Sequence, residues 1–439
     1  MEAKKRHVPV PLVFLVFVLS ISALASVSTS SAVGRFKSLN SSKDGLRGAQ
    51  VIRVSFKDKD DLTKFGKLDE SLYFDILHHS HSDADILVRR SALSSTLEHL
   101  KDSKFEYKVL VEDVRKKIDL TNSTAHRRTG QKFNFNSFHS VDDMYSYLDY
   151  LNTAYSGNSE WFVKLETIGE THEKRPLKVL RVYSGVPNAI EIFIDGGIHA
   201  REWVSPAAAL YIAKLLTESR ESLPDALKKV NFHILPIINA DGYEYSRSTA
   251  GSRLWRKNRR PSIDGGGYDC WGVDLNRNFD YKWGGIGTSD SQCDEIFRGP
   301  AARSEPETEA LSKYLDNHNN SIQAYVTLHA YGQYILYPWG YQDDVLPENW
   351  KDLQRVGETA ARYIKEKNGL HYKVGSSAQM LYPAAGASDD YAKSRGIKFS
   401  YTVELRDTGS SGFLLAETEI EGAGQDAFEV IRAIAEDLM

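Results

Sequence analysis

Four ionisable residues stand at or just beyond the ends of short apolar runs that have the composition of buried β-strands. They are His199 and Glu202 after the run 189–194, His329 after 324–328, and Glu404 after 399–403. In open α/β sheets, ligands bind at the edge that the strand ends form. Two histidines and one glutamate are a three-ligand set for catalytic zinc, which leaves one position for water. Glu404 is then a carboxylate that is free to act as the base.

Each part of this pattern is weak when it stands alone. A His-x-x-Glu pair occurs by chance in many chains, and a single histidine after a strand is more often a hydrogen-bonded core residue. The conjunction of four such groups at strand ends favours the metal interpretation. The motif His-Glu-x-x-His is absent, which disfavours the metalloproteases that carry both histidines on one helix.

The region from residue 129 onward has the pattern of a large α/β domain, in which β-rich runs alternate with helical periods. The β-rich runs are 189–194, 231–238, 324–328 and 399–403, and the helical periods are 206–218, 305–317 and 350–367. Ser205-Pro206 is a typical helix start, a cap residue followed by proline at the first helical position. Alternating strands and helices predict a mixed sheet with helices on both faces.

A smaller unit precedes this region. Strand-like runs lie at 51–56, 72–76, 84–88 and 107–111, with helix-like stretches at 57–65 and 91–100. The order β-α-β-β-α-β predicts a small, ferredoxin-like α+β split sandwich. The unit contains no convincing catalytic cluster. His78, His79 and His81 stand close together among Ser, Asp and Ala, a setting that favours a solvated polar turn over a metal site.

The first 25 residues have the pattern of a secretory signal peptide. A basic start at residues 4–6 leads into an apolar stretch that ends in Ala23-Leu24-Ala25, a small-residue cleavage site. The alternative is an uncleaved membrane anchor. Secretion to the extracellular space would expose Cys270 and Cys293 to an oxidising compartment, where they could pair. The alternative for them is two free buried thiols.

The polar segment 119–130 has no apolar period, which predicts a linker between the two units. Arg127-Arg128 within it would suit a trypsin-like protease that cuts after basic residues, and the alternative is an uncut interdomain link. Glycosylation sequons begin at Asn40, Asn122 and Asn319, and each is a weak signal because such tripeptides are common.

Length and composition exclude several classes of protein. A chain of 439 residues has room for two or three domains. Lys plus Arg number 55 and Asp plus Glu 59, for a net charge of -4, which argues against a nucleic-acid binder. Two cysteines exclude a disulfide-rich mini-domain and a four-cysteine zinc site. After residue 25 no apolar run reaches the ~20 residues that span a bilayer, so no membrane partner is expected after signal removal.

Five motifs resemble those of the zinc carboxypeptidases of the A/B subfamily. They are Gly-Ile-His-Ala-Arg-Glu-Trp-Val-Ser-Pro at 197–206, Arg-Leu-Trp-Arg-Lys-Asn-Arg at 253–259, Gly-Val-Asp-Leu-Asn-Arg-Asn-Phe at 272–279, Leu-His-Ala-Tyr-Gly-Gln at 328–333 and Val-Glu-Leu-Arg-Asp-Thr-Gly at 403–409. Their order and spacing match the family over essentially all of residues 130–439.

The resemblance implies a secreted zinc exopeptidase that is made as a zymogen. It assigns a signal peptide to residues 1–25, an activation prosegment to 26–128 and a catalytic domain to 129–439. The implied catalytic fold is a mixed, eight-stranded-type sheet flanked by helices, with one Zn²⁺ per chain. The implied partners are peptide or protein C-termini and an activating trypsin-like protease, and a monomer is the default for this family.

The resemblance also implies a role for each motif residue. His199, Glu202 and His329 match the zinc ligands, Glu404 the general base and proton shuttle, and Arg256 the residue that holds the developing oxyanion. Asn276 and Arg277 match the clamp on the substrate's terminal carboxylate, Tyr382 the mobile tyrosine that closes over it, and Arg201, Arg253 and Tyr331 outer substrate contacts. Asp274 matches the partner that fixes the tautomer of the first zinc histidine, and Cys270 with Cys293 the family's disulfide.

Elementary chemistry supports the arginine roles, because the guanidinium fork binds both oxygens of a carboxylate and a donor beside an oxyanion typically contributes about 10²–10³ in rate. Without the other motifs, the basic stretch 253–260 would be better explained as a solvated loop, and Tyr382 as an ordinary packed tyrosine.

Substrate preference depends on the residue seven positions after Tyr382, which lies at the floor of the family's side-chain pocket. Here it is Asp389, and a buried carboxylate there would pair with Lys or Arg, as in carboxypeptidase B. Ser377 and Ala387 also line the pocket by the resemblance, and neither would oppose a cation. The alternatives are that Asp389 points elsewhere, with Asp390 merely structural, and an A-type preference for aromatic or aliphatic ends.

Two functions of other kinds compete with the exopeptidase. A non-catalytic peptide- or zinc-binding relative would need neither Glu404 nor Arg256. A zinc deacylase or amidase acting on N-acyl amino acids would also use the clamp of Asn276 and Arg277, but Tyr382 and the long prosegment favour peptides.

Overall fold

The computed structural model describes residues 46–69, 74–122, 133–263, 265, 267 and 270–439. The predicted signal peptide, the Asn40 sequon and the Arg127-Arg128 pair lie outside these residues. Within them, no helix is both long enough and apolar enough to cross a membrane.

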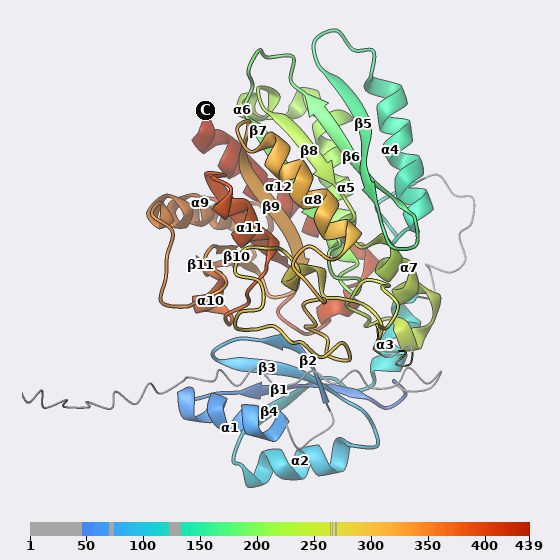
Figure 1. Ribbon diagram of the computed structural model, residues 1–439, viewed down its shortest axis with the longest axis vertical. Helices are drawn as coiled ribbons and strands as arrows, with labels where there is room; N and C mark the ends of the chain where they lie inside the picture. Colours follow the sequence, from blue (N-terminus) through green and yellow to red (C-terminus); the bar gives the residue numbers. More distant parts are fainter. Residues whose placement is uncertain (1–45, 70–73, 123–132, 264, 266, 268–269) are drawn as a thin grey trace, which may run out of the picture. The chain divides into compact units, whose positions relative to one another are not determined.

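The N-terminal unit is a four-stranded antiparallel sheet in the order β2-β3-β1-β4. Its elements are β1 (Gln50–Ser55), α1 (Lys59–Asp69), β2 (Phe74–His79), β3 (Asp83–Val88), α2 (Leu93–Asp102), β4 (Glu106–Val111) and α3 (Val114–Asn122). Figure 1 shows α1 and α2 on the same face of this sheet. The predicted order of strands and helices is confirmed.

The second strand of this unit differs from the prediction. It covers Phe74–His79 and not 72–76, because the turn to β3 lies at Ser80 and Ser82, where Ser80 N donates to Asp83 O. His78 and His79 are therefore half-buried strand residues, and only His81 is exposed. The predicted solvated turn was wrong for the first two histidines.

The large unit contains an eight-stranded mixed sheet in the order β11-β10-β12-β9-β7-β8-β6-β5. The strands are β5 (Phe162–Glu170), β6 (Pro176–Tyr183), β7 (Glu191–Gly196), β8 (Asn231–Leu235), β9 (Ile322–Ala330), β10 (Tyr334–Tyr337), β11 (Lys373–Ser376) and β12 (Phe399–Leu405). β7, β8, β9 and β12 run parallel. These central strands are the four that the apolar runs predicted.

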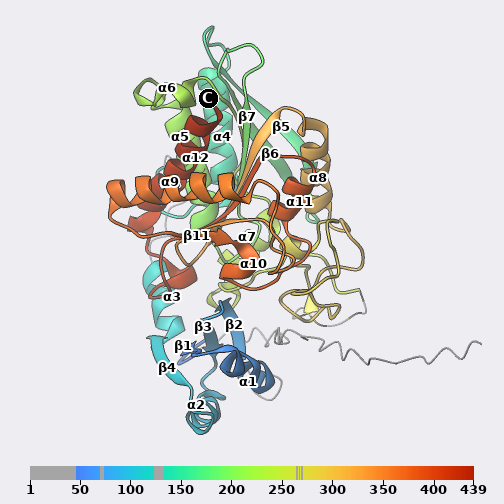
Figure 2. The same ribbon diagram turned by 90° about the vertical axis from the view of Figure 1, so that its left-hand side faces the viewer.

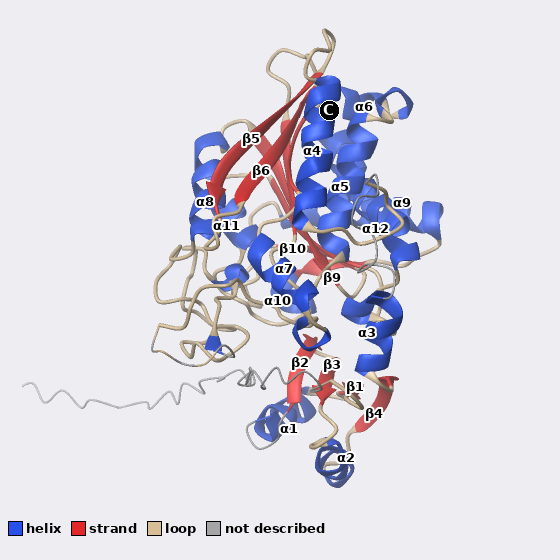
Figure 3. Cartoon of the chain, turned by 90° about the vertical axis from the view of Figure 1, so that its right-hand side faces the viewer, coloured by secondary structure: helices blue, strands red, loops and turns tan. Residues whose placement is uncertain are grey.

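Helices cover both faces of the large sheet, as predicted. They are α4 (Val141–Tyr155), α5 (Val204–Thr217), α6 (Asp225–Lys228), α7 (Ala240–Ser248), α8 (Pro306–His318), α9 (Trp350–Asn368), α10 (Ser377–Met380), α11 (Ser388–Ser394) and α12 (Ile420–Leu438). Figures 2 and 3 show α4, α5 and α12 on one face and α8 and α11 on the other. Each face is closed by its own apolar cluster.

The start of α5 corrects one local prediction. The helix begins at Val204, so Ser205 lies inside the first turn and does not cap it. Its hydroxyl instead accepts from Gly197 N and donates to the Leu328 carbonyl. Ser205 thus joins the turn after β7 to β9, the two places that carry His199 and His329.

Candidate active site

Parallel strand ends bring the four ionisable residues of the sequence pattern to one edge of the sheet. β9 and β12 pair with His329 opposite Glu404, and β7 pairs with β9 so that Gly196 lies opposite Leu328. The chain then turns through Gly197, whose φ of 64° suits glycine. A Cβ there would lie 3.1 Å from Ile237. This turn carries His199 and Glu202 back over the end of β9.

His199, Glu202 and His329 form a candidate metal site, with ligand atoms all within 4.8 Å of one another. Nδ1 of His199 lies 2.7 Å from one Glu202 oxygen, and Nδ1 of His329 lies 3.0 Å from the other. The three residues are at most 5% exposed. Two imidazole nitrogens and a carboxylate that converge on one buried point fit Zn²⁺, which takes nitrogen and oxygen donors in such sets.

Asp274 connects the first histidine to an arginine. One of its oxygens lies 3.2 Å from His199 Nε2, and the other accepts from Nε and Nη2 of Arg256 at 3.0 and 2.8 Å. Burial opposes the Asp274 charge, but Arg256, Arg277 and His199 outweigh it and hold the pKa of Asp274 well below its usual range. The carboxylate therefore stays ionised and leaves Nδ1 of His199 for a metal.

A cavity opens over this group of residues. It is lined by the three candidate ligands and by Arg256, Asn276, Arg277, Tyr331, Tyr382, Asp389 and Glu404, among others. Burial raises the pKa of Glu404, which suits a carboxylate that has to accept a proton. The structure thus brings together ten of the predicted site residues.

Arg277 is held rigidly at the side of the cavity. Its Nε donates to the Gly287 carbonyl and Nη1 to the Asn276 carbonyl, while Nη2 lies 3.3 Å from the Tyr382 hydroxyl. The Asn276 side chain accepts from Ser388 N at the start of α11. A guanidinium and a tyrosine hydroxyl so close together can bind a carboxylate between them.

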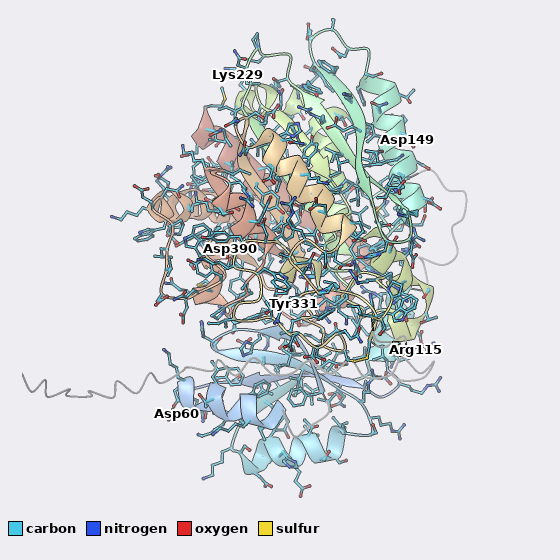
Figure 4. All side chains as sticks on the ribbon, viewed as in Figure 1. Asp60, Arg115, Asp149, Lys229, Tyr331 and Asp390 are labelled. Atoms are coloured by element: carbon cyan, nitrogen blue, oxygen red, sulfur yellow. A yellow bond between two sulfur atoms is a disulfide. The ribbon has the colours of Figure 1, made fainter. Side chains whose placement is uncertain are left out.

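The two neighbouring aspartates, Asp389 and Asp390, point to different places. Asp390, labelled in Figure 4, accepts from the backbone N–H groups of Gly340 and Tyr341 at 2.8 and 2.9 Å. Asp389 lines the cavity and accepts from the Ser377 hydroxyl at 3.3 Å. Burial raises the pKa of Asp389, so a cationic partner would stabilise its ionised form.

Arg201 and Arg253 lie beside the cavity and not in its wall. Arg253 is 2% exposed, stacks at 3.7 Å on the Trp203 ring and donates to the carbonyls of Arg201 and Phe413. Arg201 lies 4.5 Å above the Phe413 ring. Both arginines therefore support the loops that border the cavity.

Residues of the N-terminal unit contribute to the same cavity, and none of them is among the predicted site residues. Leu77, His78 and His79 line it. The ring centres of His78 and Tyr331, which Figure 4 labels, lie 5.4 Å apart, and so do the ring centres of His79 and Tyr382. The Tyr331 hydroxyl also donates to Asp85 at 2.7 Å. Only this tertiary packing identifies them, because no local motif marks β2 or β3.

The disulfide that the resemblance implied is present between Cys270 and Cys293. It closes a loop that contains Asp274, Asn276 and Arg277.

Comparison with known proteins decides the family. The zinc carboxypeptidase family profile matches residues 144–430, and the carboxypeptidase activation peptide profile matches residues 52–121. The chain belongs to the zinc carboxypeptidase family. Carboxypeptidase B of Astacus astacus is 40% identical over 300 residues, which cover 68% of this chain and 96% of that protein. Human carboxypeptidase B is 34% identical over 401 residues, or 89% and 93% of the two chains.

Among solved structures, thrombin-activatable fibrinolysis inhibitor is similar to this zinc carboxypeptidase over both units. The TM-score is 0.79 at 31% identity, covering 89% of this chain and 98% of that one. The predicted fold, the enzyme class and the presence of an activation peptide are confirmed. The protein is a zinc metallocarboxypeptidase that is made as a zymogen.

Proposed function

We propose that the chain is a secreted exopeptidase that removes C-terminal Lys or Arg from peptides and proteins. The observation that carries this proposal is the position of Asp389, a buried carboxylate in the wall of the cavity that also holds Arg277 and the candidate metal ligands. The cavity therefore offers a clamp for a chain end and an anion for its side chain.

The catalytic assignments follow from the same geometry. His199, Glu202 and His329 would hold one Zn²⁺, which when bound polarises the scissile carbonyl and activates water. Glu404 takes the proton of the attacking water and delivers it to the leaving amine. Arg256 donates to the oxygen that becomes negative in the transition state.

The substrate end is held by residues that recognise a free carboxylate. Arg277, with Asn276, binds the terminal carboxylate, and Tyr382 closes over it from the other side. The pairing of Arg277 Nη2 with the Tyr382 hydroxyl supports this assignment. Tyr331 borders the path of the upstream substrate residues, and Arg201 and Arg253 support the loops beside it.

The preference for basic residues follows from the charge that the pocket buries. Asp389 and Asp390 are both almost fully buried, and burial raises the pKa of each. Asp390 has two backbone donors from the Gly340–Tyr341 loop, whereas Asp389 lies in the cavity wall and accepts from the Ser377 and Thr402 side chains and from the backbone N–H of Asp390. All these donors are neutral, so a bound ammonium or guanidinium would compensate the Asp389 charge, and an apolar side chain would leave that charge buried without a cation.

Specificity on the trypsin-treated protein tests this proposal. We expect kcat/KM for C-terminal Lys or Arg to exceed that for Phe or Leu. Asp389→Ile is expected to lower kcat/KM for basic ends by about 10–100-fold, because a hydrogen bond to a charged group contributes about 1.5–3 kcal/mol. Ser377→Ala is the matched control, since it keeps the carboxylate and should keep the preference. Equal or reversed preference in the parent enzyme would contradict basic specificity and favour the A type.

The domain limits belong to the same proposal: a signal peptide at 1–25, a prosegment at 26–128 and a catalytic domain at 129–439, secreted as a monomer. The contacts of His78, His79 and Asp85 with Tyr331 and Tyr382 support latency. These two tyrosines border the substrate path, so the prosegment occupies the space that a peptide needs.

Proteolysis between the units should release activity. We expect trypsin to raise the activity of the full-length protein about tenfold or more, because only molecules with an open cleft bind substrate. Activity is measured on a peptide with C-terminal Arg before and after treatment, with the cut mapped by mass spectrometry. The double variant Arg127→Gln, Arg128→Gln should resist activation. Full activity in the uncut chain would exclude latency.

A further inference from the structure

The two histidines of the candidate zinc site differ in what supports them. His199 Nε2 has the Asp274 carboxylate at 3.2 Å. His329 turns Nδ1 towards Glu202 in the same way, yet the structure records no hydrogen bond for its Nε2, although the residue is 2% exposed. A histidine that gives Nδ1 to a metal carries its proton on Nε2, and such a buried donor needs an acceptor.

A buried carboxylate lies behind His329 in the sheet. Asp195 on β7 is opposite Thr327 on β9, and Thr327 is opposite Thr402 on β12. Side chains two residues apart in a strand share a face, so Tyr325, Thr327 and His329 point to the side that Asp195 occupies. Asp195 is fully buried, and no hydrogen bond is recorded for either of its carboxylate oxygens.

Hydroxyl groups surround the same carboxylate. The hydroxyls of Tyr325, Thr327 and Ser388 are buried, and none has a recorded side-chain partner. Burial raises the pKa of Asp195 to about 6, while Thr327, Tyr325 and the charge of His329 act in the opposite direction. Thr327, Tyr325 and His329 therefore lie close to the carboxylate, in agreement with the register of β7 and β9.

An ordered water would connect His329 to this group. Buried water is found where two to four polar groups converge without partners of their own. Here one imidazole donor, a carboxylate and several hydroxyls converge. A water in their midst would accept from Nε2 of His329 and donate to Asp195.

We propose that Asp195 is a positioning residue of the zinc centre, which accepts the Nε2 proton of His329 through one buried water. It fixes the tautomer and the ring orientation of His329 as Asp274 does for His199. The two histidines would then each be oriented by a carboxylate. Asp274 contacts His199 directly, and Asp195 would reach His329 through the water. This inference rests on the proposed zinc site.

Zinc affinity of the full-length protein tests the inference. Groups that orient a metal ligand typically affect metal affinity by about 10–100-fold, so Asp195→Asn is expected to weaken zinc binding by that factor in a chelator competition. The visible spectrum of the Co²⁺-substituted protein should also change, because the ring of one ligand has moved. Asp241→Asn is the matched control. Asp241 is equally buried but binds Thr171 and Arg175, so its loss should lower Tm and leave zinc affinity unchanged.

Thr327→Val is the second variant, for the case that Asp195→Asn does not fold. It removes one of the hydroxyls around the proposed water and keeps the shape of the side chain, so Tm should fall only slightly. Zinc binding should still weaken, because the water loses a partner. Zinc affinity equal to that of the parent in every folded variant would overturn the inference, as would equal weakening in Asp241→Asn. A parent protein that binds no stoichiometric zinc would instead refute the metal site itself.

Discussion

Glu404→Gln is expected to lower kcat by about 10²–10⁴-fold, the usual contribution of a general acid–base, with KM and zinc content nearly unchanged. The amide has the size of the carboxylate but cannot accept a proton from water. Glu404 lies opposite His329 in the register of β12 with β9, so it lies beside the candidate metal ligands and is not one of them. Rates on a peptide with C-terminal Lys, together with metal analysis of the trypsin-treated protein, measure the effect.

Two outcomes separate the interpretations of this variant. Loss of zinc together with activity would mean that Glu404 supports the metal and is not the base. Hydrolysis at the parent's speed would refute the base assignment. Glu366→Gln on α9 is the control. Glu366 is exposed, and among the described residues its only recorded ion pair is with Arg362, four residues earlier on the same helix. The kcat of this variant should therefore equal that of the parent.

The edge of the sheet that carries the candidate metal ligands and Glu404 could be predicted from the sequence for a simple reason. Strands buried on both faces have continuous apolar runs, and a charged residue directly after such a run is conspicuous. His329 and Glu404 stand out in this way. The same logic failed for β5, β6, β10 and β11, which lie towards the two edges of the sheet. In β5 only Val163 is buried, β6 mixes buried and half-buried positions, and β10 and β11 have four residues each.

Tertiary contacts explain what sequence reasoning missed at the site. His78 and His79 look like turn residues among Ser and Asp, but packing against aromatic rings, among them Tyr331 and Tyr382, buries them. Arg253 belongs to a basic stretch that favours a solvated loop, but its guanidinium is buried against Trp203. Its burial lowers the pKa of Arg253 to about 9.

Asp195 illustrates a different limit. It is one acidic residue inside the run Glu191–Gly196, and local reasoning about strands assigns it no role. Its significance depends on register, which places it opposite Thr327 and on the His329 side of the sheet. Register between β7 and β9 depends on pairing across 130 residues of chain, which no local pattern specifies.

Arg256→Gln is expected to lower kcat and kcat/KM together by about 10²–10³-fold, as the loss of one donor to a developing oxyanion does. Equal losses are expected because the donor acts in the transition state and not in substrate binding. Arg256 lines the cavity and also makes two hydrogen bonds to Asp274. Burial opposes its charge, but Asp274 outweighs burial and raises the pKa of Arg256, so the donor is always protonated.

The double contact of Arg256 makes the metal content of this variant decisive. If Arg256 acts on the oxyanion, Arg256→Gln keeps zinc at the parent's affinity and loses rate. If it acts only through Asp274, the variant loses zinc first, since the Asp274 carboxylate that orients His199 has lost its main counter-charge. Arg260→Gln in the same stretch is the control. Arg260 pairs with Glu305 at 2.8 Å, away from the cavity, so its loss should affect Tm while kcat and zinc affinity stay at the parent values.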